Sequence, residues 1–153
     1  MTTRDVHDSI KSEYRFDNAW LQARARLAAL EAQLDPGTMR HLQALGVGEG
    51  WHCLEVGGGG GSIAEWLCRR VGPAGRVVAT DINTRFLEAL DFRNLVVRVH
   101  NIVEDELEQG AFDLVHARTV LMHLRQRPTA LERMVSALKP GGWKPVRDDP
   151  RGV

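Results

Sequence analysis

Five consecutive glycines, at positions 57–61, are the feature that most constrains how this chain can fold. They follow a short, mostly apolar run at 51–56 and precede a segment at 62–71 whose apolar residues have helical spacing. A glycine run has a large conformational entropy in the unfolded chain, so it is rarely a purely structural connection. Between a strand and a helix, it lets the backbone approach a ligand and directs the free N–H groups of the helix toward it. The pattern therefore predicts a buried strand, a ligand-binding loop and a helix.

Strand and helix patterns alternate through the rest of the chain. This alternation predicts an α/β fold, in which a parallel sheet of Rossmann-like type carries helices on both faces through right-handed crossovers. The expected spatial order of the strands is third, second, first, fourth. The expected strands are 51–56, 76–80, 95–100 and 112–116, and the expected helices between and after them are 62–71, 83–90 and 128–138.

The first part of the chain, residues 1–45, reads as a helical segment and a candidate lid. Asp17 or Asn18 is a suitable N-cap for a helix that ends near Leu34, and the pair Asp35-Pro36 is typical of a second helix start. We therefore expect a break between two helices at this pair. A ligand-binding domain at 46–143 and an irregular tail at 144–153 complete the expected organisation.

Composition excludes several classes of function. Twenty Lys and Arg residues balance twenty Asp and Glu residues, so no global basic field is available for nucleic acid or for a membrane surface. The N-terminus lacks the apolar core of a secretory signal, and we expect a cytoplasmic protein. Cys53 and Cys68 form neither a disulfide framework nor a metal-ligand spacing, so no metal site is expected.

Asp81 ends the second expected strand, twenty residues after Gly61. An acid at this place can accept hydrogen bonds from both hydroxyl groups of a ribose, although it can also cap a helix. Together with the glycine loop, it indicates a nucleoside-containing cofactor at the carboxyl ends of the strands.

The spacing leaves NAD open as that cofactor, because Gly59, Gly61 and Ala64 satisfy the dinucleotide pattern. Glu55 argues against NAD, since it stands in an apolar strand where a buried carboxylate needs a partner. A ligand with an ammonium group would supply that partner.

From about Leu45 to Trp143 the sequence resembles the class I S-adenosylmethionine-dependent methyltransferases. Residues 55–61 are similar to the family's acid-x-Gly-x-Gly-x-Gly loop, and 77–82 resemble its second strand with the ribose-binding acid. Residues 112–118 resemble its fourth strand, and 138–143 resemble the turn before its fifth. The resemblance implies S-adenosylmethionine as cofactor and methyl transfer to a small-molecule acceptor.

The resemblance also implies roles for individual residues. The cofactor-binding residues would be Glu55 at the methionine end, Gly57, Gly59 and Gly61 beneath the cofactor, Asp81 at the ribose, Ile82 on the adenine face, and Asn101 with Ile102 at the adenine edge. Asn101 stands where the family usually has an acid. His116 and His123 follow or end the fourth strand on the side from which substrates approach, so each is a candidate proton acceptor.

The match stops after Trp143, where a charged segment with two prolines begins. We expect a frame-shifted or truncated coding sequence there, with the later strands of the family's fold missing. The fourth strand, 112–116, would then be a bare edge that a second copy of the chain covers, or that lowers solubility. Two alternatives to the methyltransferase remain: a non-catalytic or partner-dependent nucleoside-binding remnant, and an NAD-dependent oxidoreductase.

Overall fold

The computed structural model describes residues 3–143 and 146–147. Its strands are β1 (His52–Val56), β2 (Arg76–Asp81), β3 (Leu95–Val99), β4 (Phe112–Arg118), β5 (Leu138–Trp143) and β6 (Val146–Arg147). They form a parallel sheet with helices on both faces, which confirms the predicted fold class, and the strand order β3-β2-β1-β4-β5 contains the predicted order of the first four. The short 3-10 helices η1 (Leu87–Ala89) and η2 (Leu121–His123) lie between β2 and β3 and after β4, respectively.

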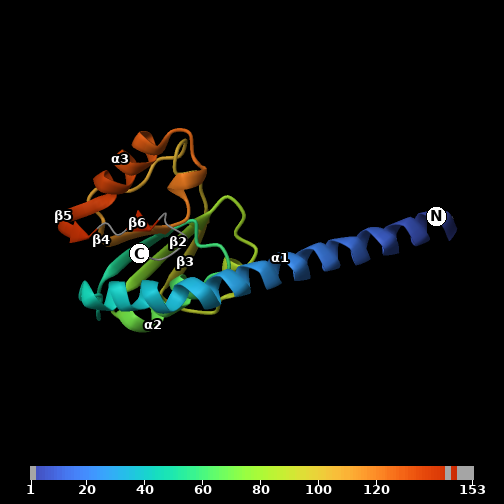
Figure 1. Cartoon of the computed structure of the whole chain (residues 1–153), viewed down its shortest axis with the longest axis horizontal. Helices are drawn as coiled ribbons and strands as arrows, with labels where there is room; N and C mark the ends of the chain where they lie inside the picture. The colour runs from blue at the N-terminus through green and yellow to red at the C-terminus, as the bar shows by residue number, and fades with distance from the viewer. Residues whose placement is uncertain (1–2, 144–145, 148–153) are drawn as a thin grey trace.

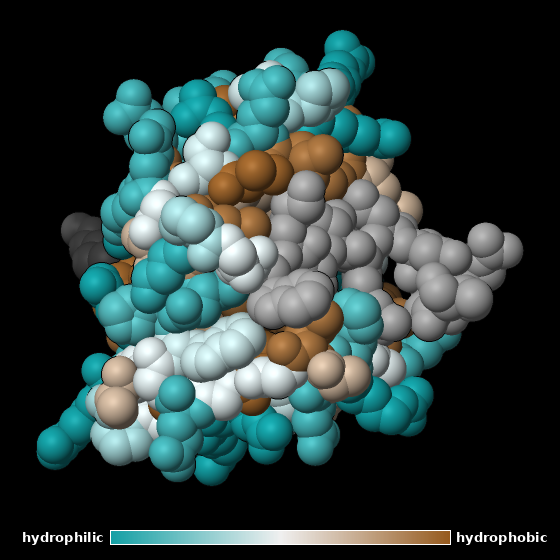
Figure 2. Space-filling model, turned by 90° about the vertical axis from the view of Figure 1, so that its left-hand side faces the viewer, coloured by the Kyte–Doolittle hydropathy of each residue, from teal (hydrophilic) through white to brown (hydrophobic). Residues whose placement is uncertain are grey.

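Two helical layers enclose the sheet. Helices α1 (Thr3–Ala44) and α2 (Ser62–Val71) cover one face, and α3 (Arg127–Ala137) covers the other (Figure 1). Side chains alternate across the central strands, so Cys53 packs toward α2 and Leu54 toward α3, and both are fully buried. Hydrophilic side chains cover the outer surfaces of both layers, and hydrophobic ones gather between them (Figure 2). Burial on both faces explains why β1 and β4 carry apolar residues on both of their faces.

The prediction that β4 would be a bare edge is wrong. β5 pairs with its beginning, where Phe112 is the partner of Leu138, and β6 pairs with its end, where Ala117 is the partner of Val146. Pro140 lies in β5, which the sheet order places at an edge, and proline is tolerated there because one side of an edge strand needs no donors. The reason for expecting a second copy of the chain to pair with β4 is therefore gone. Of the predicted irregular tail, only 146–147 are described, and they form β6.

The predicted break at Asp35-Pro36 is also wrong, because α1 is one helix of 42 residues with Pro36 inside it. Leu34, Thr38 and Leu42 lie one helical turn apart and are all buried against the domain. This continuous packed face stabilises the helix more than one lost backbone hydrogen bond destabilises it. The N-terminal part of α1 extends well beyond the sheet (Figure 1).

The predicted helix at 83–90 is reduced to η1. The side-chain oxygen of Asp81 accepts a hydrogen bond from the N–H of Asn83, and that of Asn83 accepts one from the N–H of Arg85. Such Asx turns compete with helical hydrogen bonding, which explains the irregular start of this segment. Phe86 and Leu87 are nevertheless buried.

A bidentate ion pair joins β3 to the loop before β4. Arg98 donates from Nη1 and Nη2 to the two carboxylate oxygens of Glu108, at 3.0 and 2.8 Å. These hydrogen bonds lower the pKa of Glu108 to about 2. Because the lowered pKa belongs to the folded state, the stabilisation is complete above the ordinary carboxyl pKa and is lost as the pH falls through about 2.

We therefore expect Glu108→Gln to lower the free energy of unfolding at neutral pH by at most about 1 kcal/mol, because both side chains are partly exposed. Urea denaturation should show the difference between variant and parent shrinking as the pH is lowered from about 7 to about 3. A difference that stays constant over this range would mean that the ion pair contributes nothing.

Candidate active site

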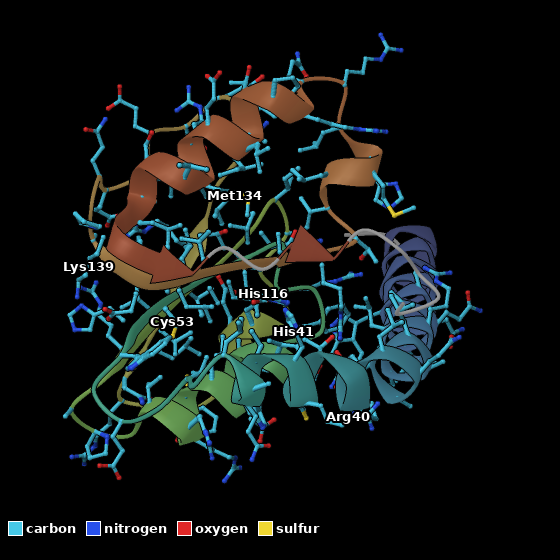
Figure 3. All side chains as sticks on the ribbon, turned by 60° about the vertical axis from the view of Figure 1, so that its left-hand side comes forward. Arg40, His41, Cys53, His116, Met134 and Lys139 are labelled. Carbon is cyan, nitrogen blue, oxygen red and sulfur yellow. The ribbon has the colours of Figure 1, made fainter. Side chains whose placement is uncertain are left out.

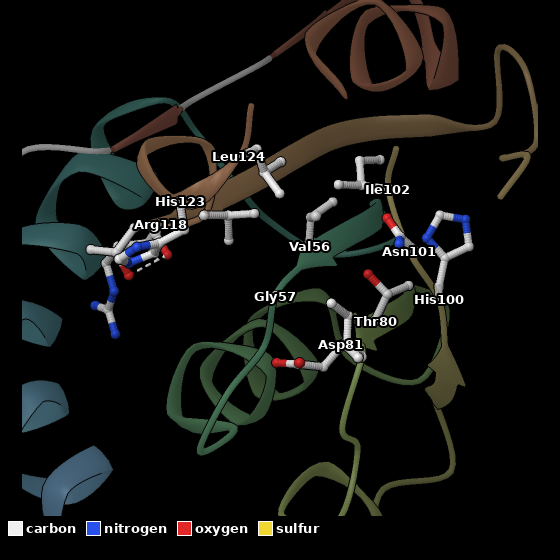
Figure 4. A pocket seen from close by; sticks show the side chains of 13 residues that line it. Val56, Gly57, Thr80, Asp81, His100, Asn101, Ile102, Arg118, His123 and Leu124 are labelled. Atoms are coloured by element: carbon white, nitrogen blue, oxygen red, sulfur yellow. Dashed lines mark hydrogen bonds between the residues drawn. The ribbon is translucent and has the colours of Figure 1, made fainter. Parts of the chain in front are cut away.

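A cleft of about 260 Å³ opens at the carboxyl ends of β1, β2 and β4 (Figure 4). This is the side of a parallel sheet on which ligands bind. The predicted residues Gly57, Asp81, Ile82, Asn101, Ile102 and His123 all line it, together with Val56, Thr80, His100, Arg118, Thr119, Val120 and Leu124. The lining thus mixes apolar side chains with polar ones that converge from different strands.

A smaller cavity of about 70 Å³ lies between the glycine loop and α1. Glu55 lines it, and so do Leu27, Leu30 and Glu31 of α1. Both cavities are lined by Gly57, Arg118 and Thr119, so they meet at the start of the glycine loop. An elongated ligand that passes over Gly57 would therefore reach both of them.

Gly57 lies close to Val120 on the opposite wall of the cleft. Its φ of +67° lies in the left-handed region that side chains disfavour, and a Cβ built on it would overlap the Cγ2 methyl of Val120. The backbone thus occupies space that only glycine leaves open. Thr119, next to Val120, has a φ of +57°, which makes it a strained non-glycine residue at the same point.

Asp81 connects the second strand to the loop. Its Oδ2 accepts a hydrogen bond from the N–H of Gly59 at 2.9 Å, and its Oδ1 accepts one from the N–H of Asn83 at 3.2 Å. The carboxylate is therefore fixed at the rim of the cleft and begins an Asx turn. Beside it, the side chain of Ile82 is 72% exposed, which leaves an apolar surface free for a flat ligand.

Asn101 and His100 form the far wall of the cleft. Oδ1 of Asn101 accepts a hydrogen bond from the N–H of Val103 at 3.0 Å, so it has one lone pair left for a ligand. His100, which the sequence patterns did not mark, is buried with Nε2 at 3.1 Å from the carbonyl oxygen of Glu106.

Glu55 has a partner that its sequence context did not reveal. The carboxylate is buried, and its Oε2 lies 2.5 Å from Nδ1 of His116. The two residues face each other because they are register partners on β1 and β4. A ligand ammonium is thus not required to explain the burial of Glu55.

The two histidines occupy different environments. His116 is completely buried and lines neither cavity. His123 is exposed at the end of η2 and lines the larger cleft. Of the two candidate proton acceptors, the structure brings only His123 to the cleft.

Helix α1 covers the glycine loop. Nη1 of Arg24 donates to the carbonyl oxygen of Gly60 at 3.3 Å, and Glu31 lies so close that a Cβ on Gly60 would overlap its carboxylate. Burial raises the pKa of Glu31, and the positive charge of Arg24 opposes that rise. The polar side chains of α1 are therefore part of the loop's surroundings.

Arg118 fastens α1 to the end of β4. Its Nη1 lies 2.9 Å from Oδ1 of Asp35 and donates to Oγ1 of Thr38 at 3.1 Å. The side chains of Arg118 and Asp35 are 13% and 14% exposed, so water screens their attraction only partly. Alternation along β4 places Arg118 on the same face as His116, but nothing in the sequence indicates that α1 would meet it there.

We expect Arg118→Met to lower the free energy of unfolding by roughly 1–3 kcal/mol, because it leaves the carboxylate of Asp35 without its cation. Hydrogen exchange should become faster around residues 34–38 of α1. Arg69→Met is a matched control, since the pair of Arg69 with Glu65 is 68% and 41% exposed and should contribute little. Equal effects of the two variants would contradict the role given to Arg118.

Within residues 3–143 and 146–147, no group of three or more His, Cys, Asp or Glu side chains is arranged to hold a metal ion. Over the same residues, no helix combines the length and apolar character that crossing a membrane requires.

Comparison with known proteins identifies relatives of this chain. The family described as methyltransferase domain matches residues 54–143. The ubiquinone/menaquinone biosynthesis C-methyltransferase UbiE of Idiomarina loihiensis is 32% identical over 105 residues, which are 63% of this chain and 42% of that protein. Methyltransferase str3 of Strobilurus tenacellus is 33% identical over 108 residues, which are 70% of this chain and 38% of that protein. The chain thus spans less than half the length of these two relatives.

Solved structures share the fold. A SAM-dependent methyltransferase from Aquifex aeolicus superposes with a TM-score of 0.67 at 23% identity, over 80% of this chain and 73% of that chain. The methyltransferase CalH, solved in complex with SAH, gives a TM-score of 0.55 at 24% identity, over 65% of this chain and 32% of that chain. At these identities the likeness concerns the arrangement of the sheet and its helices.

Proposed function

Because the chain belongs to the family of class I S-adenosylmethionine-dependent methyltransferase domains, we propose that it binds S-adenosylmethionine across both cavities and transfers the methyl group to a small-molecule acceptor. The observation that carries the proposal is the position of Gly57 between the two cavities, with the carboxylate of Asp81, which we propose as the ribose ligand, at the same loop. A cytoplasmic location is part of the same proposal.

The residues present fit the parts of the cofactor. The smaller cavity, with Glu55 on its wall, suits the methionine end, and Gly57 and Gly59 line it, so that the chain of atoms could pass over the loop there. Gly61 lines neither cavity, and a Cβ built on it would meet Leu90, so it is not proposed to contact the cofactor. In the larger cleft, Asp81 would hold the ribose hydroxyl groups and Ile82 would cover one face of the adenine. Asn101 and Ile102 would meet the adenine edge, Asn101 through an amide that can both donate and accept.

When bound, S-adenosylmethionine would supply an electrophilic methyl group on a sulfonium, and attack of the acceptor on the methyl carbon, in line with the S–CH3 bond, would release S-adenosylhomocysteine. The chain's own contribution is then to orient the two partners and exclude water. His123 is the residue we propose for taking a proton from the acceptor, because it is exposed at the cleft. His116 is not proposed for this role, because it is completely buried behind Glu55.

Calorimetric titration of the 153-residue chain tests the cofactor assignment directly. We expect S-adenosylhomocysteine to bind at one site and NAD not to displace it. Displacement by NAD would favour the oxidoreductase alternative. Binding without methyl transfer to any member of a panel of small nucleophiles would favour the non-catalytic alternative.

A further inference from the structure

The buried pair formed by Glu55 and His116 lies directly beneath the smaller cavity. Both residues sit on the face of the sheet that α1 and α2 cover, as do their neighbours Cys53 and Leu114 (Figure 3). The side chains of Glu55 and His116 are 4% and 0% exposed, and Nδ1 of His116 lies 2.5 Å from Oε2 of Glu55. Glu55 reaches the cavity, whereas His116 lies behind it.

The histidine has no other polar contact in the described part of the chain. Its Nε2 is buried and has no hydrogen-bond partner there. A histidine that served only to fill the core would normally satisfy both ring nitrogens, or be replaced by an apolar residue of similar size. The polar chemistry of His116 is therefore directed at one group, the carboxylate of Glu55.

A carboxylate buried to this extent loses its hydrogen bonds to water and needs donors in the protein to replace them. The N–H of Nδ1 is such a donor, and it engages one oxygen of Glu55. Because this hydrogen bond fixes one oxygen of the carboxylate, it also determines how the other oxygen faces a ligand in the cavity.

We propose that His116 is a positioning residue for the cofactor: its hydrogen bond holds the Glu55 carboxylate oriented toward the ammonium group of the methionine end. The proposal rests on the proposed function, because it takes S-adenosylmethionine as the ligand of this cavity. It assigns His116 no contact with the acceptor and no proton transfer during the reaction.

The test compares two ligands that share the adenosine and its 5′-sulfur and differ in the amino-acid end, whose ammonium group Glu55 would bind. S-adenosylhomocysteine carries the amino-acid end, and 5′-methylthioadenosine lacks it. For His116→Leu, which removes the donor, we expect the affinity for S-adenosylhomocysteine to fall about tenfold or more, while that for 5′-methylthioadenosine changes less than about twofold.

His116→Asn is the matched rescue variant, because its amide N–H can take the place of Nδ1–H. It should recover most of the affinity for S-adenosylhomocysteine. In a Glu55→Gln background, His116→Leu should have no further selective effect, because the carboxylate on which it acts is gone. If the leucine variant does not fold, His116→Met, which is flexible and also lacks a donor, replaces it in the same comparison.

The outcomes separate this proposal from the proposed function. If the unaltered chain binds no S-adenosylhomocysteine, the proposed function fails. If the unaltered chain binds it but the donor-free variant keeps its affinity, His116 does not position Glu55. Equal loss of both ligands, or no recovery in the asparagine variant, would show a purely structural histidine and overturn the proposal.

Discussion

Replacing Gly57 by alanine should lower the affinity for S-adenosylhomocysteine about 100-fold, which corresponds to about 2.7 kcal/mol. The added methyl group would overlap Val120, a β-branched residue with little rotamer freedom, exactly where the two cavities meet. Either Val120 or the loop must then move into the space that the cofactor needs. Calorimetric titration of the folded variant measures this loss.

Gly110→Ala is the matched control for Gly57→Ala. Gly110 has a similar φ of +61°, and a Cβ built on it would meet no atom within 4 Å. Both variants should lose about 1–2 kcal/mol of stability, because both place a side chain in the left-handed region, and the Gly57 variant should lose more through its overlap with Val120. Only the Gly57 variant should lose binding. If both variants bind as the parent does, the contact between the loop and Val120 is not part of the cofactor site.

The order of the elements was predictable because their signals are local. Each of the first four strands is a short apolar run between turn residues, and the structure places each within two residues of its predicted bounds. The carboxyl ends of parallel strands share one edge of the sheet, so the spacing of Gly57 and Asp81 was enough to bring them into one cleft. Their roles toward the cofactor stay predictions.

What the sequence did not reveal depends on contacts between distant segments. Pro36 is typical of a helix start, yet packing of Leu34, Thr38 and Leu42 continues the helix through it. Residues 138–143 resemble a turn, but pairing with β4 makes them a strand. Both errors have one cause. Helix and strand propensities describe an isolated segment, whereas in the folded chain packing and strand pairing with other segments decide its structure.

The same reason explains the missed site residues. Glu31 and Arg118 acquire their places only when α1 docks on the end of β4, and no spacing in the sequence encodes that docking. The partner of Glu55 is 61 residues away and is fixed by strand register. Alternation along β4 does place His116 on the same face as Leu114, so a register prediction for β1 and β4 would have found the pair.

Replacing Asp81 by alanine should weaken the binding of S-adenosylhomocysteine by something like 1–3 kcal/mol, because it removes a charged acceptor from two ribose hydroxyl groups. The structure adds a second reason. Oδ2 of Asp81 also holds the N–H of Gly59, so the alanine variant releases the middle of the glycine loop.

Asp81→Asn separates the two contributions. Asparagine keeps an oxygen that can accept from Gly59, but it loses the charge and one of the two acceptors that the ribose would use. If the ribose contacts dominate, the asparagine variant should bind nearly as weakly as the alanine variant. If the hydrogen bond to the N–H of Gly59 dominates, asparagine should restore most of the affinity.

A second titration of both variants uses adenosine, which contains the ribose but does not reach over the loop. Adenosine should bind more weakly to the variants only if the ribose contacts dominate. If the alanine variant binds both ligands with unchanged affinity, Asp81 does not contact the cofactor and serves only to begin the turn at Asn83.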